Sequence, residues 1–166
     1  MPIQKVSILH SCDLSNDIAQ QLQMKLQPLD GLSVELVKMS SSREFKALLE
    51  ASPTTLVVFI AQTIENENPP EDAGSCIRFF KRKNHPDNML EGKFVFSVLG
   101  LGDSNLLLDR QHTAAKDCNQ VAQSLDKRLE ALGGTRFFEL GEADERSGLT
   151  EVEPWIKTLV EKIKSC

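Results

Sequence analysis

The sequence predicts an α/β protein in which a five-stranded parallel sheet is covered by helices on both faces. Short apolar runs alternate along the chain with segments whose apolar residues recur every three or four positions. The runs at 56–60 and 94–99 are almost wholly apolar, as strands buried on both faces are. The run at 32–37 alternates apolar and polar residues, as an edge strand does. These features favour the strand order 2-1-3-4-5 and right-handed crossovers.

The strands are expected at Val6–His10, Leu32–Val37, Leu56–Ile60, Phe94–Leu99 and Arg136–Leu140. The fourth strand, interrupted only by the small Ser97, is expected to end at Gly100. Two glycines and three small polar residues follow it up to Asn105, which predicts a loop. Ligands of open α/β sheets bind outside the carboxyl ends of the strands, so this loop is expected to border any small-molecule site.

Five helices are expected to follow the five strands. Their apolar stripes are Ile18, Leu22 and Leu26; Phe45, Leu48 and Leu49; Ala73, Ile77 and Phe80; Ala114, Cys118, Val121, Leu125, Leu129 and Leu132; and Trp155, Leu159, Val160 and Ile163. Gly133 is expected to end the fourth helix as the residue after its C-cap. Thr150 is expected to begin the last helix, with Pro154 in its first turn.

Length and charge narrow the class of protein. The chain has 166 residues, which fits one domain spanning residues 1–166. A formal net charge of −5 argues against a nucleic-acid or anionic-membrane surface and allows an acidic face for a basic protein partner. No apolar run approaches the roughly 18 residues of a membrane span. The amino-terminal residues lead directly into a strand, so no signal peptide is expected.

The cysteines and histidines indicate no catalytic or metal centre. Cys12, Cys76, Cys118 and Cys166 are far apart in the sequence and form no CxxC pair. This spacing favours reduced thiols in a cytoplasmic protein over a disulfide framework, and no metal-ligand spacing is present. No motif gives His10 or His112 a serine or cysteine partner, so both are expected to be ordinary loop or surface residues.

Several short motifs in the second half of the chain resemble one family. They are residues 99–105, 125–134, 141–144 and 152–156, and the pair Pro69-Pro70 followed by two acidic residues agrees with them. Together they resemble the FMN-binding, flavodoxin-like domain of diflavin reductases such as methionine synthase reductase and its cytosolic relatives. The resemblance implies a three-layer α/β/α sandwich and a place for FMN. The FAD and NADPH domains of those enzymes are absent from residues 1–166.

In that family three loops hold the flavin, and each has a counterpart here. The first loop, which cradles the phosphate, corresponds to Ser11, Cys12, Asp13, Leu14, Ser15 and Asn16. The second corresponds to Gln62, Thr63, Ile64, Glu65, Asn66 and Glu67. The third corresponds to Leu99, Gly100, Leu101, Gly102, Asp103, Ser104, Asn105 and Leu106.

All three loops depart from the family pattern. The first has no glycine and is about two residues short, and Asp13 and Asp17 add negative charge where a phosphate would bind. Glu65 and Glu67 replace the two glycines of the second loop. Leu106 replaces the aromatic residue that stacks on the flavin, an interaction of about 1 to 3 kcal/mol by analogy with bases on aromatic platforms. These departures predict that no cofactor is tightly bound and that the FMN site is vestigial.

Two functions of different classes remain open. The favoured interpretation is a degenerate flavodoxin-like domain that acts as a protein-interaction or structural module. The alternative is an electron-transfer domain that carries FMN in a remodelled pocket. An enzyme with catalytic residues of its own has no motif behind it.

Individual residues also allow two interpretations. Gly100 to Asp103 line a flavin pocket or only form a turn needed for folding. Cys12 is either a reactive thiol at a helix N-terminus or simply a small residue. The run Lys81 to Lys83 is either a solvated helix end or an anion site, and the solvated end is favoured.

A segment with three consecutive leucines follows the third loop. The segment begins with Leu106, Leu107, Leu108 and Asp109. The resemblance implies that it is about nine residues longer than the corresponding stretch of the family. Loops at this edge of a sheet tolerate insertions and carry function. The leucines either fill the vacated flavin crevice or form an apolar patch for a protein partner, rimmed by Glu65, Glu67 and Asp109. Leu107, Leu108 and Asp109 are the candidate partner contacts.

Overall fold

The computed structural model describes residues 2–64, 68–104 and 118–166 and confirms the predicted α/β class. Its strands are β1 (Lys5–His10), β2 (Ser33–Lys38), β3 (Thr55–Gln62), β4 (Val95–Gly102), β5 (Thr135–Arg136) and β6 (Gly141–Asp144). The strand order is β2-β1-β3-β4-β5, and β6 also pairs with β4. All of these pairings are parallel. The predicted order 2-1-3-4-5 is therefore confirmed.

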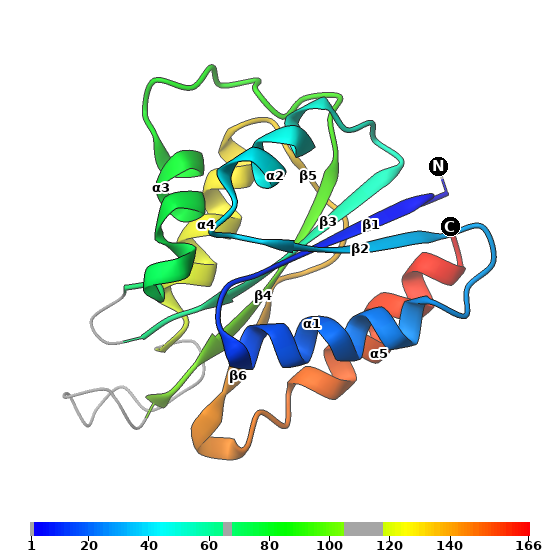
Figure 1. The fold of residues 1–166 in the computed structure, drawn as a ribbon, viewed down its shortest axis with the longest axis vertical. Coiled ribbons are helices and arrows are strands. Elements are labelled where there is room, and N and C mark those ends of the chain that lie inside the picture. Colours follow the sequence, from blue (N-terminus) through cyan, green and yellow to red (C-terminus); the bar gives the residue numbers. More distant parts are fainter. Residues whose placement is uncertain (1, 65–67, 105–117) are drawn as a thin grey trace.

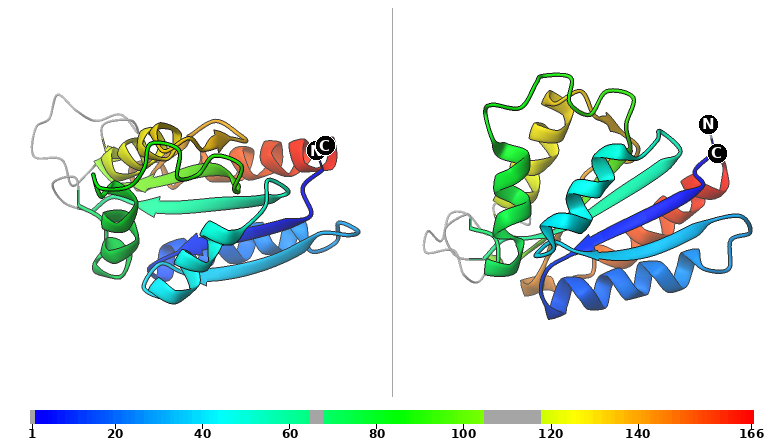
Figure 2. Two further views of the ribbon diagram at one scale, coloured as in Figure 1. Left: turned by 90° about the horizontal axis from the view of Figure 1, so that it is seen from above. Right: turned by 45° about the horizontal axis from the view of Figure 1, so that its top comes forward.

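Helices cover both faces of the sheet (Figures 1 and 2). They are α1 (Asp13–Leu26), α2 (Ser42–Ala47), α3 (Gly74–Lys81), α4 (Gln120–Ala131) and α5 (Val152–Lys164). Short 3-10 helices occupy Leu48–Glu50, Glu71–Ala73 and Glu145–Ser147. Helices α1 and α5 share one apolar core with the sheet, and α2, α3 and α4 share the other. Among the described residues, no helix has the length and apolar character required to cross a bilayer.

The two cores follow from the alternation of side chains along the strands. In β3, Val57 and Phe59 point to the α2–α3–α4 side, whereas Val58 and Ile60 point to the α1–α5 side. All four side chains are fully buried. A strand buried on both faces cannot alternate apolar and polar residues, which explains its continuous apolar run.

Two strand predictions need correction. β4 does not end at Leu99 but continues through Gly102, because Leu99 to Gly102 pair with Gly141 to Asp144 of β6. The fifth strand was expected at Arg136–Leu140. The observed strands are instead β5 (Thr135–Arg136) and β6 (Gly141–Asp144), so only Arg136 of the predicted strand lies in the ladder and residues 137–140 connect the two strands. The predicted loop at Gly141 therefore begins with a strand.

The helix predictions hold with shifted boundaries. α4 begins at Gln120, so its stripe starts at Val121; the predicted Ala114 lies outside the described residues. α5 begins at Val152 rather than Thr150. Gly133 has φ +87°, and the N–H groups of Gly133 and Gly134 donate to the carbonyls of Glu130 and Leu129. This double hydrogen bond ends α4 as a Schellman motif, which confirms the predicted role of Gly133.

Candidate functional site

The carboxyl ends of β1, β3, β4 and β6 meet at one edge of the sheet, on the left side of Figure 1. The amino terminus of α1 lies at the same edge, directly after β1. The described parts of the three predicted loops are therefore brought together, as the resemblance implied. Glu65, Asn66, Glu67, Asn105 and Leu106 lie outside the described residues. So do the candidate partner contacts Leu107, Leu108 and Asp109.

The first loop is organised by the hydroxyl group of Ser15, which is fully buried. Ser15 Oγ accepts hydrogen bonds from the backbone N–H of Ser11 at 2.9 Å and of Cys12 at 3.0 Å. It donates to the carbonyl of Cys12 at 3.1 Å. One side chain from the first turn of α1 therefore fixes the backbone that enters the helix.

The lack of glycine in this loop has no conformational cost. Cys12, the N-cap of α1, has φ −115° and ψ −179°, an extended conformation open to any residue. Among the described residues outside glycine, only Leu149 has a positive φ. The first loop is therefore folded without the left-handed conformation for which glycine would be needed.

The amino terminus of α1 offers donors for an anion. The N–H groups of Asp13 and Leu14 begin the helix and have no acceptor within it, as at every helix start. The positive end of the helix dipole adds to this attraction. Ser11 adds a partly exposed hydroxyl group, and the carboxylate of Asp13 is exposed beside them. The thiol of Cys12, partly buried, donates to Oε1 of Gln62 at the end of β3.

The second loop joins the site to α4. Thr63 is buried, and its hydroxyl oxygen accepts the backbone N–H of Val121 at 3.0 Å. Val121 is the second residue of α4, so a side chain from the β3 loop caps that helix. Ile64 is 40% exposed, and its N–H donates to the carbonyl of Asn68 at 2.7 Å. Thr63 therefore has a structural role that its position in the sequence did not reveal.

Alternate residues at the end of β4 face opposite sides of the sheet. Leu99 and Leu101 are buried in the α1–α5 core and do not line a ligand site. Gly100 and Gly102 face the start of α4, where a Cβ on Gly100 would lie 2.7 Å from that of Ala122. Both glycines therefore allow the close approach of α4, and they do so from within β4 and not in the predicted turn.

Ser104 follows β4 at the same edge. It is 2% exposed, and its backbone N–H donates to Oδ1 of Asp144 at 2.9 Å. Its hydroxyl group also interacts with the carboxylate of Asp144. Asp144 therefore fixes the position of Ser104 at this edge of the sheet.

Asp144, at the end of β6, is a site residue that sequence reasoning did not single out. It is buried, and its carboxylate accepts the N–H groups of Ser104 and Arg146. Burial alone would raise the pKa of Asp144, but these N–H groups, the hydroxyl group of Ser104 and the charge of Arg146 hold it below the ordinary value. The pKa of neighbouring Glu145 is raised by its partial burial and by the negative charges of Asp103 and Asp144. The edge is therefore acidic.

The remaining single-residue predictions have mixed outcomes. His10 is the last residue of β1 and is 7% exposed, so its expected surface or loop position was wrong. Lys81, Arg82 and Lys83 are exposed at the end of α3, as a solvated helix end should be. Cys76 is buried, and burial raises the pKa of its thiol to about 12, so it is an inert thiol. No metal-binding cluster occurs among the described residues, and His112 is not one of them.

His10 predicts a pH dependence of stability. Burial, with a contribution from the charge of Lys38, holds the pKa of His10 below its ordinary value of 6.5 despite the opposing effect of Glu44. The folded state thus binds this proton less readily than the unfolded chain does. The contribution of neutral His10 to the free energy of unfolding is therefore fully present above pH 6.5, and it decreases as the pH falls below 6.5. In urea denaturation from pH 7.5 to 5, His10→Asn should lose less stability than the wild type. An equal loss in His10→Asn and the wild type would contradict this, and His85→Asn is the matched control.

An open parallel sheet of this order, with a helix amino terminus at the carboxyl end of its first strand, defines a flavodoxin-like protein. The flavodoxin family profile matches residues 15–155. The chain therefore belongs to the flavodoxin family.

Curated relatives agree with the predicted resemblance. Methionine synthase reductase of Bos taurus is 35% identical over 130 residues, which cover 78% of this chain and 17% of that protein. NADPH-dependent diflavin oxidoreductase 1 of Bos taurus is 34% identical over 111 residues, covering 65% of this chain and 17% of that protein. The chain thus spans less than a fifth of the length of these relatives.

Solved structures show the same fold. A cysteine-to-alanine mutant of a flavodoxin from Pseudomonas aeruginosa has a TM-score of 0.70 and 20% identity, covering 96% of this chain and 99% of that one. Oxidised flavodoxin 1 from Bacillus cereus has a TM-score of 0.65 and 15% identity, covering 97% of each chain.

These relationships correct the prediction that no cofactor is tightly bound. The family, the fold and the diflavin relatives point to FMN binding. The prediction rested together on the loss of loop glycines, on a shortened first loop with Asp13 and Asp17, on Glu65 and Glu67, and on Leu106. Asp13 and Asp17 are exposed in the first turns of α1, whereas Glu65, Glu67 and Leu106 lie outside the described residues.

Proposed function

We propose that this chain is an electron-transfer domain of the diflavin-reductase type that binds FMN in a remodelled pocket at the carboxyl edge of its sheet. The observation that carries the proposal is the amino terminus of α1, held at the end of β1 by Ser15. Its orphan N–H groups and the Ser11 hydroxyl group are donors of the kind that bind a phosphate.

The residues of the site would divide the work of holding the cofactor. The N–H groups of Asp13 and Leu14 and the hydroxyl group of Ser11 would hold the phosphate. Asp144 fixes the backbone of Ser104 and so positions the loop that leaves β4. FMN, when bound, would supply the ability to accept and donate electrons. The carboxylates of Asp13, Asp144 and Glu145 surround the site with negative charge, which disfavours additional negative charge on a bound cofactor.

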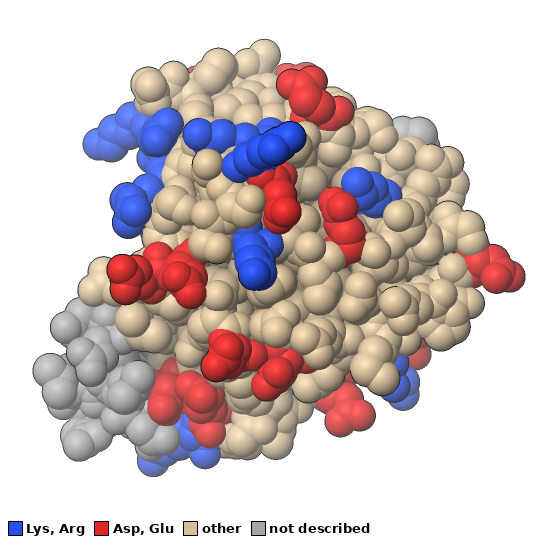
Figure 3. Space-filling view, viewed as in Figure 1, with Lys and Arg blue, Asp and Glu red and all other residues tan. Residues whose placement is uncertain are grey.

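The acidic edge also supports a proposal about the redox partner. Asp13, Asp17, Glu71, Asp72 and Glu145 are exposed in the segments that border this edge. Figure 3 shows basic side chains grouped at the upper left of the molecule, and acidic side chains from the left to the lower centre with some basic side chains below them. A partner protein with a basic face would be attracted to the acidic side, and salt would weaken the association.

FMN titration of the purified apoprotein tests the proposed function. We expect one FMN to bind per chain, with quenching of flavin fluorescence and a Kd of about 1 µM or below, equivalent to at least about 8 kcal/mol. Riboflavin, which lacks the phosphate, is the matched control and should bind at least tenfold more weakly. Absence of saturable binding up to millimolar FMN would overturn the proposal.

Alkylation of Cys12 gives a second readout that does not depend on electron transfer. Cys12 is partly exposed beside the proposed phosphate position, whereas Cys166 is exposed at the far end of the chain. Saturating FMN should slow the reaction of iodoacetamide with Cys12 at least tenfold and leave that of Cys166 unchanged, as followed by peptide mass spectrometry. Equal rates at Cys12 with and without bound FMN would contradict the proposed placement of the phosphate.

A further inference from the structure

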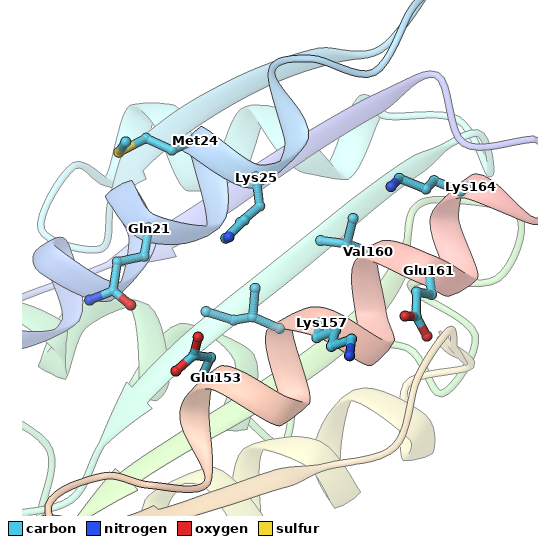
Figure 4. A pocket seen from close by; sticks show the side chains of 9 residues that line it. Gln21, Met24, Lys25, Glu153, Lys157, Val160, Glu161 and Lys164 are labelled. Atoms are coloured by element: carbon cyan, nitrogen blue, oxygen red, sulfur yellow. The ribbon is translucent and has the colours of Figure 1, made fainter.

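A groove lies between helices α1 and α5, on the side of the sheet that these two helices cover. The groove has a volume of about 530 Å³, and Ile156 and Val160 of α5 contribute apolar side chains to it (Figure 4). Met24 of α1 borders it and is 70% exposed, the most exposed large apolar side chain among the described residues. An apolar groove beside an exposed methionine is a surface suited to contact with another protein.

The charges along α5 have a regular order. Glu153, Lys157, Glu161 and Lys164 line the groove, all four are exposed, and the signs alternate as negative, positive, negative, positive. Their spacing of three or four residues places them along one stripe of the helix. In the described part of the chain, no ion pair within 4.0 Å uses any of these four side chains. Their charges are therefore available to a partner.

This order of charges is complementary to itself when reversed. If a second α5 runs antiparallel to the first, Glu153 of one copy faces Lys164 of the other, and Lys157 faces Glu161. The position halfway between Glu153 and Lys164 almost coincides with the position halfway between Lys157 and Glu161, close to residues 158 and 159. A single two-fold axis passing there would therefore bring both pairs into contact. A two-fold axis generates each contact twice, as in the isologous interfaces of homodimers.

We propose that the α1–α5 groove binds a second copy of this chain in a two-fold symmetric dimer. The α5 of each protomer lies over the groove of the other, and Met24 contacts the partner helix. Two helices of 14 and 13 residues are each about 20 Å long at 1.5 Å per residue, and their joint face covers roughly 400 Å² per copy. The total of roughly 800 Å² is below the size of a stable interface, so the dimer is weak and reversible. The interface is on a different surface from the proposed FMN site and does not depend on it.

Sedimentation velocity of the full chain from 10 µM to 1 mM tests the proposal. The wild type is expected to show a reversible monomer–dimer equilibrium. Lys157→Glu and Glu161→Lys should each weaken it at least tenfold, because each places like charges opposite one another across the axis. The double variant Lys157→Glu with Glu161→Lys exchanges the two charges and should restore association to within about threefold of the wild type.

The control is Lys127→Glu, an equal change of charge at an exposed position on α4. It should leave the dimer unchanged, and Met24→Asp should abolish it. All substituted side chains are exposed, and circular dichroism can confirm that each variant is folded. A wild type that stays monomeric at 1 mM would overturn the proposal and leave the groove to another occupant. A dimer insensitive to Lys157→Glu, or a double variant that is not restored, would also overturn it.

Discussion

Replacing Gly102 by alanine is expected to lower the free energy of unfolding by about 3 kcal/mol. A Cβ at this position would lie 2.6 Å from Sγ and 2.8 Å from the carbonyl carbon of Cys118, distances that real Cβ atoms do not show. Part of the obstacle is backbone, which cannot rotate away as a side chain can. β4 cannot retreat either, because Gly102 is paired with Asp144 of β6.

The measurement is urea denaturation followed by circular dichroism, complemented by thermal melting with an expected fall in Tm of roughly 6–12 °C. Gly74→Ala is the matched control, since the three atoms nearest to its Cβ would all belong to the flexible guanidinium group of Arg78. Gly74 begins α3, where alanine is expected to leave stability unchanged or to increase it by up to about 1 kcal/mol. Equal stabilities of Gly102→Ala and the wild type would show that α4 can move away from β4.

Ser15→Ala is expected to destabilise the protein by about 2 kcal/mol and to weaken FMN binding at least tenfold. The substitution removes the acceptor of the Ser11 and Cys12 N–H groups, and an unmade hydrogen bond costs about 1–3 kcal/mol when the group is buried. These two groups are partly buried, so the lower end of that range applies to each. The loop that presents the proposed phosphate donors then loses its fixed geometry.

Ser11→Ala tests the proposed contact with the ligand without disturbing the hydrogen bonds of Ser15 that fix the loop. Among the described residues, the Ser11 hydroxyl group has only a long contact of 3.5 Å with Ser15 Oγ, so its loss should change stability by less than about 0.5 kcal/mol. Its proposed hydrogen bond to phosphate is worth about 1.5–3 kcal/mol, equivalent to at least a tenfold change in Kd. Calorimetric titration and thermal melting of both variants provide the measurements. Wild-type FMN affinity in Ser11→Ala would remove this residue from the site, and wild-type stability in Ser15→Ala would refute the role of its hydroxyl group.

The location of the candidate site could be predicted from the sequence, but the roles of its residues could not. The three loops were placed at one sheet edge because parallel strands of known order end together. The role of Thr63 depends on Val121, 58 residues further along the chain. Asp144 likewise acts on Ser104, 40 residues earlier. No local pattern signals either contact, because neither partner is near in sequence.

The pattern of apolar residues was enough to predict the class of fold, the strand order and most of the buried residues of the helices. Each of these depends on whether a segment is buried, and the spacing of its apolar residues shows this directly. The pattern did not predict that β4 continues through Gly102, that the fifth strand is divided or that the Ser15 hydroxyl group organises a glycine-free loop. Strand ends and loop conformations are fixed by hydrogen-bond partners and close approaches, and tertiary packing supplies these from distant parts of the chain.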